Sequence, residues 1–170
     1  MTARKILLLG EIGVGKTSLV RRLVLDELPS DYRATMGVDL YRYEMRRLGE
    51  SGRHALELVI WDLDGNYGDS IFEHVYSRGA SAALVIGDAT RLSTLEHMVR
   101  LAEGFEAAMP SREMALIVNK LDLLGEPDPA RLPARLAEAR RPLIWTSAKT
   151  ATNVETAFRR VADAILRRET

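Results

Sequence analysis

The sequence contains no cysteine, and only four of its 24 basic residues are lysine. The absence of cysteine excludes disulfides, thiolate metal sites and a thiol nucleophile, and it fits the reducing cytoplasm, where we expect the protein to work. The 24 acidic residues cancel the basic ones, so the net charge favours neither nucleic acid nor an anionic membrane as the main partner. No apolar run approaches the roughly 20 residues of a membrane span, and the N-terminus leads directly into a strand rather than a signal peptide.

Strand and helix patterns alternate along the chain, which at 170 residues suits a single domain, 1–170. Strands are predicted over residues 6–9, 38–47, 54–62, 82–86, 114–118 and 142–145. The runs 38–47 and 54–62 flank a connection with two glycines and should form an antiparallel hairpin. Elsewhere the alternation predicts an α/β fold with a mostly parallel sheet and helices on both faces.

Helices are predicted to end near residue 25 and to span residues 70–78 and 129–140, with two more after residues 93 and 153. Ser93 and Glu96 form an S-x-x-E pattern that predicts a capping box, and Thr152 or Asn153 should cap the last helix. In that helix Val154, Phe158 and their apolar neighbours recur at helical spacing.

A glycine-rich stretch, G-E-I-G-V-G-K-T at residues 10–17, follows the first strand and precedes a helix. We call it the phosphate loop, because its spacing lets backbone N–H groups hold a phosphate at the positive end of the helix dipole. Lys16 would neutralise the outer phosphates and Thr17 would ligate Mg²⁺.

A second stretch, Asp62-Leu63-Asp64-Gly65, ends the strand expected beside the first one. Asp62 can hold the Mg²⁺ ion there, and the Gly65 N–H can approach a terminal phosphate.

Two further stretches, each directly after a predicted strand, indicate which nucleotide base the site would bind. Asn119-Lys120-Leu121-Asp122, which we call the base loop, ends in a carboxylate that can accept two hydrogen bonds from guanine, whereas adenine would leave that charge unpaired. Asn119 is expected to brace neighbouring loops. Ser147-Ala148-Lys149 completes the pocket, with the Ala148 N–H suited to the guanine carbonyl. Three of the four lysines fall in these motifs, in a chain that otherwise uses arginine.

Together these motifs resemble the signature regions of Ras-like small GTPases, and Y-x-x-T-M-G-V-D at residues 32–39 is most similar to the Rab branch. The resemblance covers essentially the whole chain. It implies a P-loop NTPase fold with a six-stranded sheet, one antiparallel edge strand and five helices, and a switch that binds GTP or GDP with Mg²⁺ and hydrolyses GTP. Loops 26–38 and 63–78 would recognise effector or regulator proteins.

The resemblance also assigns roles to single residues. Lys16, Thr35 and Asn66 are the expected catalytic residues, and Thr17, Thr35 and Asp62 the expected Mg²⁺ ligands. The expected nucleotide-binding residues are Glu11, Ile12, Gly13, Val14, Gly15, Lys16, Thr17, Ser18, Leu28, Tyr32, Thr35, Gly65, Asn119, Lys120, Asp122, Ser147, Ala148 and Lys149.

Several residues depart from the family pattern. Asn66 replaces the usual catalytic glutamine with a shorter amide, Asp64 places a carboxylate beside the γ-phosphate, and Ile12 crowds the path of an arginine finger supplied by a partner. Leu28 stands where an aromatic commonly covers the base. We therefore expect slow hydrolysis; the alternative is a GTP-binding interaction module with little or no hydrolysis. An ATP-dependent kinase shares the phosphate loop but has no use for the two guanine motifs.

The chain ends soon after the last predicted helix, with no cysteine that could be prenylated. We therefore expect no direct membrane anchor.

Overall fold

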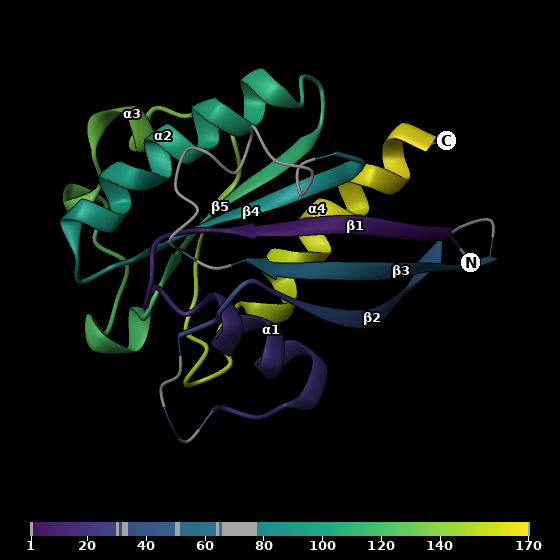
Figure 1. The fold of residues 1–170 in the computed structure, drawn as a ribbon, viewed down its shortest axis with the longest axis horizontal. Helices are drawn as coiled ribbons and strands as arrows, with labels where there is room; N and C mark the ends of the chain where they lie inside the picture. Colours follow the sequence, from purple (N-terminus) through teal and green to yellow (C-terminus); the bar gives the residue numbers. More distant parts are fainter. Residues whose placement is uncertain are drawn as a thin grey trace.

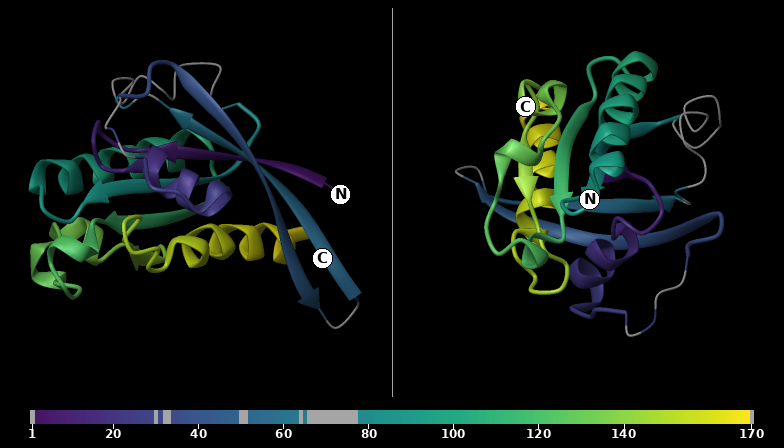
Figure 2. Two further views of the ribbon diagram at one scale, coloured as in Figure 1. Left: turned by 90° about the horizontal axis from the view of Figure 1, so that it is seen from below. Right: turned by 90° about the vertical axis from the view of Figure 1, so that its left-hand side faces the viewer.

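The computed structural model describes residues 2–29, 31, 34–49, 52–63, 65 and 78–169. Six strands form one sheet in the order β2-β3-β1-β4-β5-β6 (Figure 1). Their bounds are β1 Thr2–Leu9, β2 Val38–Gly49, β3 Gly52–Leu63, β4 Ala80–Asp88, β5 Glu113–Asn119 and β6 Leu143–Trp145. Among the described strands, β2 and β3 form the one antiparallel pair, with β2 at the edge of the sheet, so the predicted sheet and hairpin are confirmed. Strands β2 and β3 run as a long twisted pair along one side of the molecule (Figure 2).

Four α-helices lie in the described part of the chain: α1 Lys16–Leu25, α2 Leu92–Ala108, α3 Ala134–Ala137 and α4 Val154–Glu169. The helix expected over 70–78 falls on residues that the structure does not describe, apart from Arg78 at its end. None of the described helices is long and apolar enough to cross a membrane.

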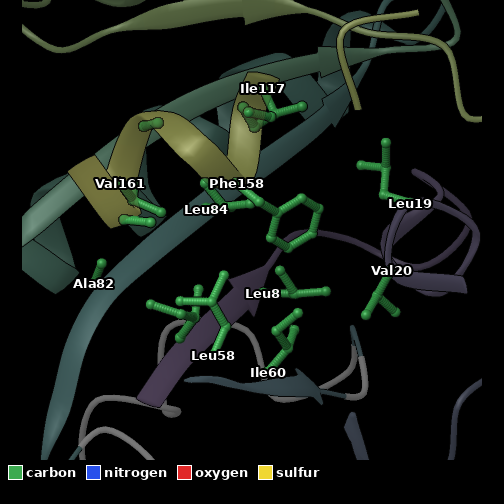
Figure 3. Packing of buried hydrophobic residues seen from close by; sticks show 14 of the residues in the cluster. Leu8, Leu19, Val20, Leu58, Ile60, Ala82, Leu84, Ile117, Phe158 and Val161 are labelled. Atoms are coloured by element: carbon green, nitrogen blue, oxygen red, sulfur yellow. The ribbon is translucent and has the colours of Figure 1, made fainter. Parts of the chain in front are cut away.

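The core has two layers because successive side chains of a strand point to opposite faces of the sheet. Leu8 of β1 packs with Phe158 of α4 and Val20 of α1 on one face (Figure 3). Leu7, its neighbour, packs with Phe105 and other residues of α2 on the opposite face. Helices therefore cover both faces, as predicted.

The side chains of β3 alternate between the two faces of the sheet in the same way. Leu56, Leu58 and Ile60 are fully buried under α1 and α4, and Trp61 packs on the α2 side. Trp61 also lies under Lys5, whose ammonium is 3.7 Å from the ring centre. The lysine outside the motifs thus has a packing role.

The helix predicted over 129–140 is wrong. The segment instead forms a short 3₁₀ turn, η4 (Pro129–Arg131), and the single-turn helix α3. Pro133 separates them: it has no N–H to donate, and it holds Leu132 in an extended conformation with ψ at 135°.

The capping box predicted at Ser93 and Glu96 is also wrong. Helix α2 begins at Leu92, so Ser93 lies inside its first turn. The hydroxyl of Thr94 makes the local contacts instead: it accepts from the Asp88 N–H at 2.9 Å and donates to the Arg91 carbonyl at 2.7 Å. The start of α2 is thereby tied to the end of β4.

The last helix begins directly after Asn153, as expected. The Asn153 side chain reaches back, and its amide donates to the Trp145 carbonyl at 2.9 Å. This contact fixes the turn between β6 and α4, which carries Ser147-Ala148-Lys149.

Replacement of Phe158 by alanine should lower the free energy of unfolding by about 3–5 kcal/mol, because a fully buried ring is lost and a cavity remains. Urea unfolding followed by circular dichroism measures this. Leu92→Ala is the control, since Leu92 is 57% exposed and its loss should change the free energy by about 0.5 kcal/mol or less. Equal losses in the two variants would contradict the two-layer core.

Candidate functional site

The carboxyl ends of the parallel strands surround a cavity of about 450 Å³, which lies between the phosphate loop and the segment that carries Leu28 and Thr35. This is the edge where an open α/β sheet binds its ligands. The described residues that line it are Ile12, Gly13, Gly15, Lys16, Thr17, Ser18, Arg21, Leu28, Pro29, Asp31, Ala34, Thr35, Gly65 and Lys120. Most of the residues predicted to contact phosphate therefore lie together.

Lys16 is held over the phosphate loop by backbone carbonyls. Its ammonium donates to the carbonyls of Gly10 at 2.8 Å and Glu11 at 3.1 Å, and the residue is only 7% exposed. A buried cation at the start of α1 makes this end of the cavity strongly attractive to anions.

Three oxygen-bearing side chains from separate segments meet beside Lys16. The hydroxyls of Thr17 and Thr35 are 2.8 Å apart, and the Thr17 hydroxyl also donates to Oδ2 of Asp62. All three expected Mg²⁺ ligands are thus in mutual reach. Among the described residues no group of three or more His, Cys, Asp or Glu side chains forms a metal site. A metal ion bound here would therefore need further coordinating oxygens from the molecule that occupies the cavity.

Asp62 is fully buried, and burial raises the pKa of its carboxyl above the ordinary value, although the hydrogen bond from Thr17 and the charge of Lys16 oppose this. Its Oδ1 has no hydrogen-bond partner among the described residues. A buried carboxylate oxygen without a donor, next to two hydroxyls, suits a hard cation such as Mg²⁺.

Two glycines permit other groups to approach the backbone closely: a side chain at Gly15 and another backbone segment at Gly65. Gly15 has φ at +101°, and a Cβ there would lie 2.3 Å from the Asn119 side-chain nitrogen. A Cβ on Gly65 would lie 2.4 Å from the Ile12 nitrogen. Neither position accepts a side chain, which explains the glycine in each motif.

Asn119 connects the base loop to two other loops. Its Nδ2 donates to the Val14 carbonyl at 3.0 Å, and its Oδ1 accepts from the Thr146 hydroxyl at 3.0 Å. The structure thus shows the bracing contacts expected of Asn119. Val14 itself is fully buried, with its side chain in the core, and it does not line the cavity.

Asp122 and the Ser147-Ala148-Lys149 turn lie side by side. The Ser147 hydroxyl donates to Asp122 Oδ1 at 2.7 Å, which orients the carboxylate expected to bind the base. The Ala148 N–H, expected to meet the guanine carbonyl, instead donates to Asn119 Oδ1 at 3.3 Å in this structure. The Lys149 residue is exposed.

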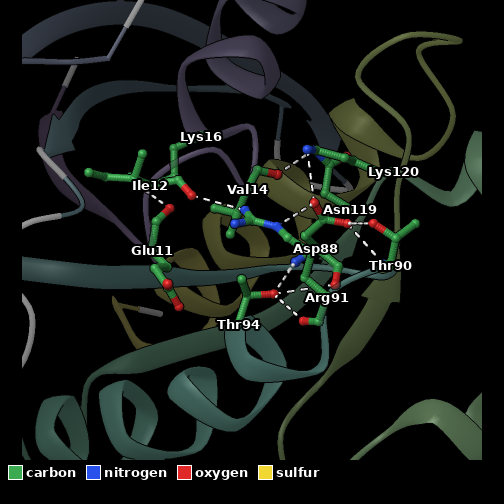
Figure 4. Close-up of polar contacts among 10 residues, drawn as sticks. All are labelled: Glu11, Ile12, Val14, Lys16, Asp88, Thr90, Arg91, Thr94, Asn119 and Lys120. Atoms are coloured by element: carbon green, nitrogen blue, oxygen red, sulfur yellow. Dashed lines mark hydrogen bonds and ion pairs between the residues drawn. The ribbon is translucent and has the colours of Figure 1, made fainter.

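Asp88, at the carboxyl end of β4, is a site residue that sequence reasoning missed. It is 1% exposed, and Oδ2 accepts from Lys120 Nζ at 2.9 Å and from Arg91 Nε at 3.0 Å (Figure 4). Its Oδ1 accepts from the Thr90 hydroxyl at 2.7 Å. A charged residue at the carboxyl end of a buried strand is the signal that could have identified it.

Burial alone would raise the pKa of Asp88, but the hydrogen bonds from Lys120, Thr90 and Arg91 outweigh burial and hold the pKa below its ordinary value. The carboxylate therefore stays charged and fixes the Lys120 ammonium beside the cavity.

Two arginines that carry no motif also reach site loops. Arg91 donates from Nη2 to the Ile12 carbonyl at 2.9 Å. Arg22 of α1 donates to the carbonyls of Ala148 at 2.8 Å and Lys149 at 3.1 Å. No sequence signal points to them, because a backbone carbonyl can be offered by any residue.

The other residues predicted for the site differ in their position relative to the cavity. Leu28 lines the cavity and is 42% exposed. The Glu11 carboxylate lies outside the cavity lining, 3.6 Å from Nδ1 of His97 on α2. Tyr32, Asp64 and Asn66 lie outside the described residues.

Comparisons with known proteins place the chain among small GTPases. A model described as the Ras family matches residues 5–167. Ypt/Rab-type GTPase YPT7 of Saccharomyces cerevisiae is 31% identical to this chain, and the alignment covers 95% of this chain and 81% of the yeast protein. RABF2a of Arabidopsis thaliana is 31% identical, and that alignment covers 96% of this chain and 81% of the plant protein. Rab-25 of Bos taurus is 34% identical, and that alignment covers 95% of this chain and 75% of the bovine protein.

Replacing Asp88 by asparagine should remove a pH-dependent part of the stability. Since the folded pKa of Asp88 lies below its unfolded value of about 3.9, its contribution is fully present above that value and is lost as the pH falls through the folded pKa. Urea unfolding at several pH values from 6 downward should show wild type losing its advantage over Asp88→Asn in the acid range. A constant difference at every pH would contradict the paired carboxylate.

Proposed function

The chain belongs to the Ras family and is a small GTPase, a molecular switch that binds and hydrolyses GTP, and we propose that it holds the nucleotide with Mg²⁺ in the cavity described above. The observation that carries this assignment is the meeting of Thr17, Thr35 and Asp62 beside the Lys16 ammonium. Mg²⁺ bound there would neutralise charge on the outer phosphates and in the transition state of their hydrolysis.

Guanine is the base that the other end of the site fits. Asp122 is oriented by Ser147, and Asn119 holds the base loop against the phosphate loop. The carboxylate can accept two hydrogen bonds from the N1–H and amine of guanine, and adenine offers no such pair. The ammonium of Lys120 is fixed by Asp88, and its methylenes would lie along the purine.

In the proposed reaction a water molecule attacks the γ-phosphorus, and the bond from that phosphorus to the β–γ bridging oxygen breaks to give GDP and phosphate. Lys16 and the N–H groups of the phosphate loop would stabilise the negative charge that develops. Thr35 would bind the metal and the γ-phosphate only before this step. Asn66 is the residue that we assign to orient the water.

We further propose that hydrolysis without a partner is slow. The Asn66 amide has one methylene fewer than the glutamine of the family, so it reaches less far toward the water. By the family resemblance, Asp64 would place a carboxylate beside the γ-phosphate, and its negative charge would repel that phosphate. Ile12 lines the cavity, where its branched side chain obstructs an arginine offered by another protein. A rate near zero would make the chain a GTP-dependent interaction module, our second candidate function.

Partner recognition is assigned to the loops 26–38 and 63–78, whose state would follow the nucleotide. Met36 is 89% exposed and Leu40, at the start of edge strand β2, is 58% exposed. Exposed apolar side chains beside Thr35 suit effector or regulator proteins, because a change at Thr35 moves the same segment.

Asp122→Ala should weaken GDP binding by about 100-fold or more and reduce the preference for GDP over ADP, since the carboxylate supplies the base contacts. Competition against a fluorescent GDP analogue measures both quantities. Glu126→Ala is the control, because Glu126 is an exposed carboxylate close by in the sequence. Equal affinity of wild type for GDP and ADP would refute the assignment of the base pocket.

Asn66→Gln should accelerate single-turnover GTP hydrolysis by about tenfold or more, because the longer side chain restores the reach to the water. Quenched-flow or HPLC measurement on the preloaded protein gives the rate, and unchanged GDP affinity shows that the site is intact. If the variant hydrolyses GTP no faster than wild type, Asn66 does not explain the slow hydrolysis. A wild type with no measurable turnover would favour the interaction module.

A further inference from the structure

We propose that Arg91 is a positioning residue, which acts from behind the phosphate loop to aim the Gly13 N–H at the phosphates. This inference rests on the proposed function. Arg91 stands at the start of α2 and does not line the cavity, whereas Gly13 does. Its effect on a ligand must therefore pass through the loop.

The contact that carries the inference joins Arg91 to the peptide group between Ile12 and Gly13. Nη2 of Arg91 donates to the Ile12 carbonyl at 2.9 Å (Figure 4). No described peptide bond is cis, and in a trans peptide the N–H points opposite to the C=O. A carbonyl held outward by Arg91 therefore turns the Gly13 N–H toward the interior of the loop.

The hydrogen bond also changes the strength of this donor. A cation on the carbonyl oxygen polarises the peptide group, so the N–H at its other end becomes a stronger donor to an anion. Gly13 has φ at +78°, a conformation that glycine adopts without strain. Because Gly13 has no side chain, it has no side-chain contact of its own that could hold the peptide.

Arg91 can hold the peptide because it is itself anchored. Its Nε donates to Asp88 at 3.0 Å, and Asp88 is buried and also binds Lys120 at 2.9 Å. The guanidinium thus uses two donors in different directions, one for the carboxylate and one for the Ile12 carbonyl. A lysine at this position could keep the charge beside Asp88, but its ammonium cannot reproduce the fork.

The test compares GDP release from wild type with release from Arg91→Met and Arg91→Lys, with Arg100→Met as matched control. Arg100 is an exposed arginine on the same helix. With a fluorescent GDP analogue and Mg²⁺, both Arg91 variants should release GDP about tenfold faster than wild type, and Arg100→Met at the wild-type rate. Thermal unfolding without nucleotide checks that the variants remain folded.

A second measurement separates positioning from a general loss of structure. The amide resonance of Gly13 in the GDP-bound protein should shift in both Arg91 variants, while those of Asp122 and Lys149 stay in place. Release from Arg91→Lys at the wild-type rate would overturn the inference, because charge on Asp88 alone would then suffice. An unmoved Gly13 resonance in Arg91→Met would overturn it too.

The result also distinguishes this inference from the function on which it rests. If wild type holds GDP and the Arg91 variants release it no faster, only the role of Arg91 is wrong. If wild type holds no guanine nucleotide, both the proposed site and the role of Arg91 are overturned.

Discussion

The outward orientation of the phosphate-loop carbonyls is the constraint on which the rest of the site depends. A loop can present N–H groups to an anion only if the carbonyls of the same peptide groups point away and find donors there. The carbonyls of Gly10 and Glu11 accept from Lys16, which belongs to the motif itself. Those of Ile12 and Val14 accept from side chains of other elements. The motif is therefore completed by residues far away in the sequence.

The order of the parallel strands brings these distant donors to the loop. Strands β1, β4 and β5 are neighbours, and the register pairs Asp88 of β4 with Asn119 of β5. Asn119 then reaches Val14, and Asp88 anchors the Arg91 side chain that reaches Ile12. The same register places Lys120 against Asp88. Phosphate and base ends of the site are thus joined through the carboxyl ends of two adjacent strands.

Sequence reasoning predicts the features that depend on residue type and spacing. The sheet and its antiparallel edge follow from the alternation of strand and helix patterns. Thr17 and Asp62 stand in motifs beside predicted strands, whereas Thr35, which lies close to Thr17, is expected there from the family resemblance alone. It fails where a tertiary contact overrides a local signal: Thr94 makes contacts with Asp88 and Arg91 at the start of α2, where a local pattern had favoured Ser93.

It also fails where a single residue outweighs a periodic pattern. Apolar residues between 129 and 140 have helical spacing, but Pro133 interrupts the segment and leaves one turn of helix. The contacts of Arg22 and Arg91 are invisible for a different reason. Both side chains bind backbone carbonyls, and every residue type has one, so the sequence does not show which residue accepts the hydrogen bond.

The use of arginine and lysine follows the same geometry. Lys16 and Lys120 both line the cavity, where a compact ammonium can lie among phosphates or along a base. Arg91 and Arg22 stand behind the loops, and each bridges two acceptors: Arg91 joins a carboxylate to a carbonyl, and Arg22 joins two successive carbonyls. Bridging needs donors fixed in different directions, which the guanidinium has and the ammonium lacks. A chain that holds its ligand loops from behind by such bridges therefore needs arginine at those positions, whereas Lys16 and Lys120 stand where a ligand would be met.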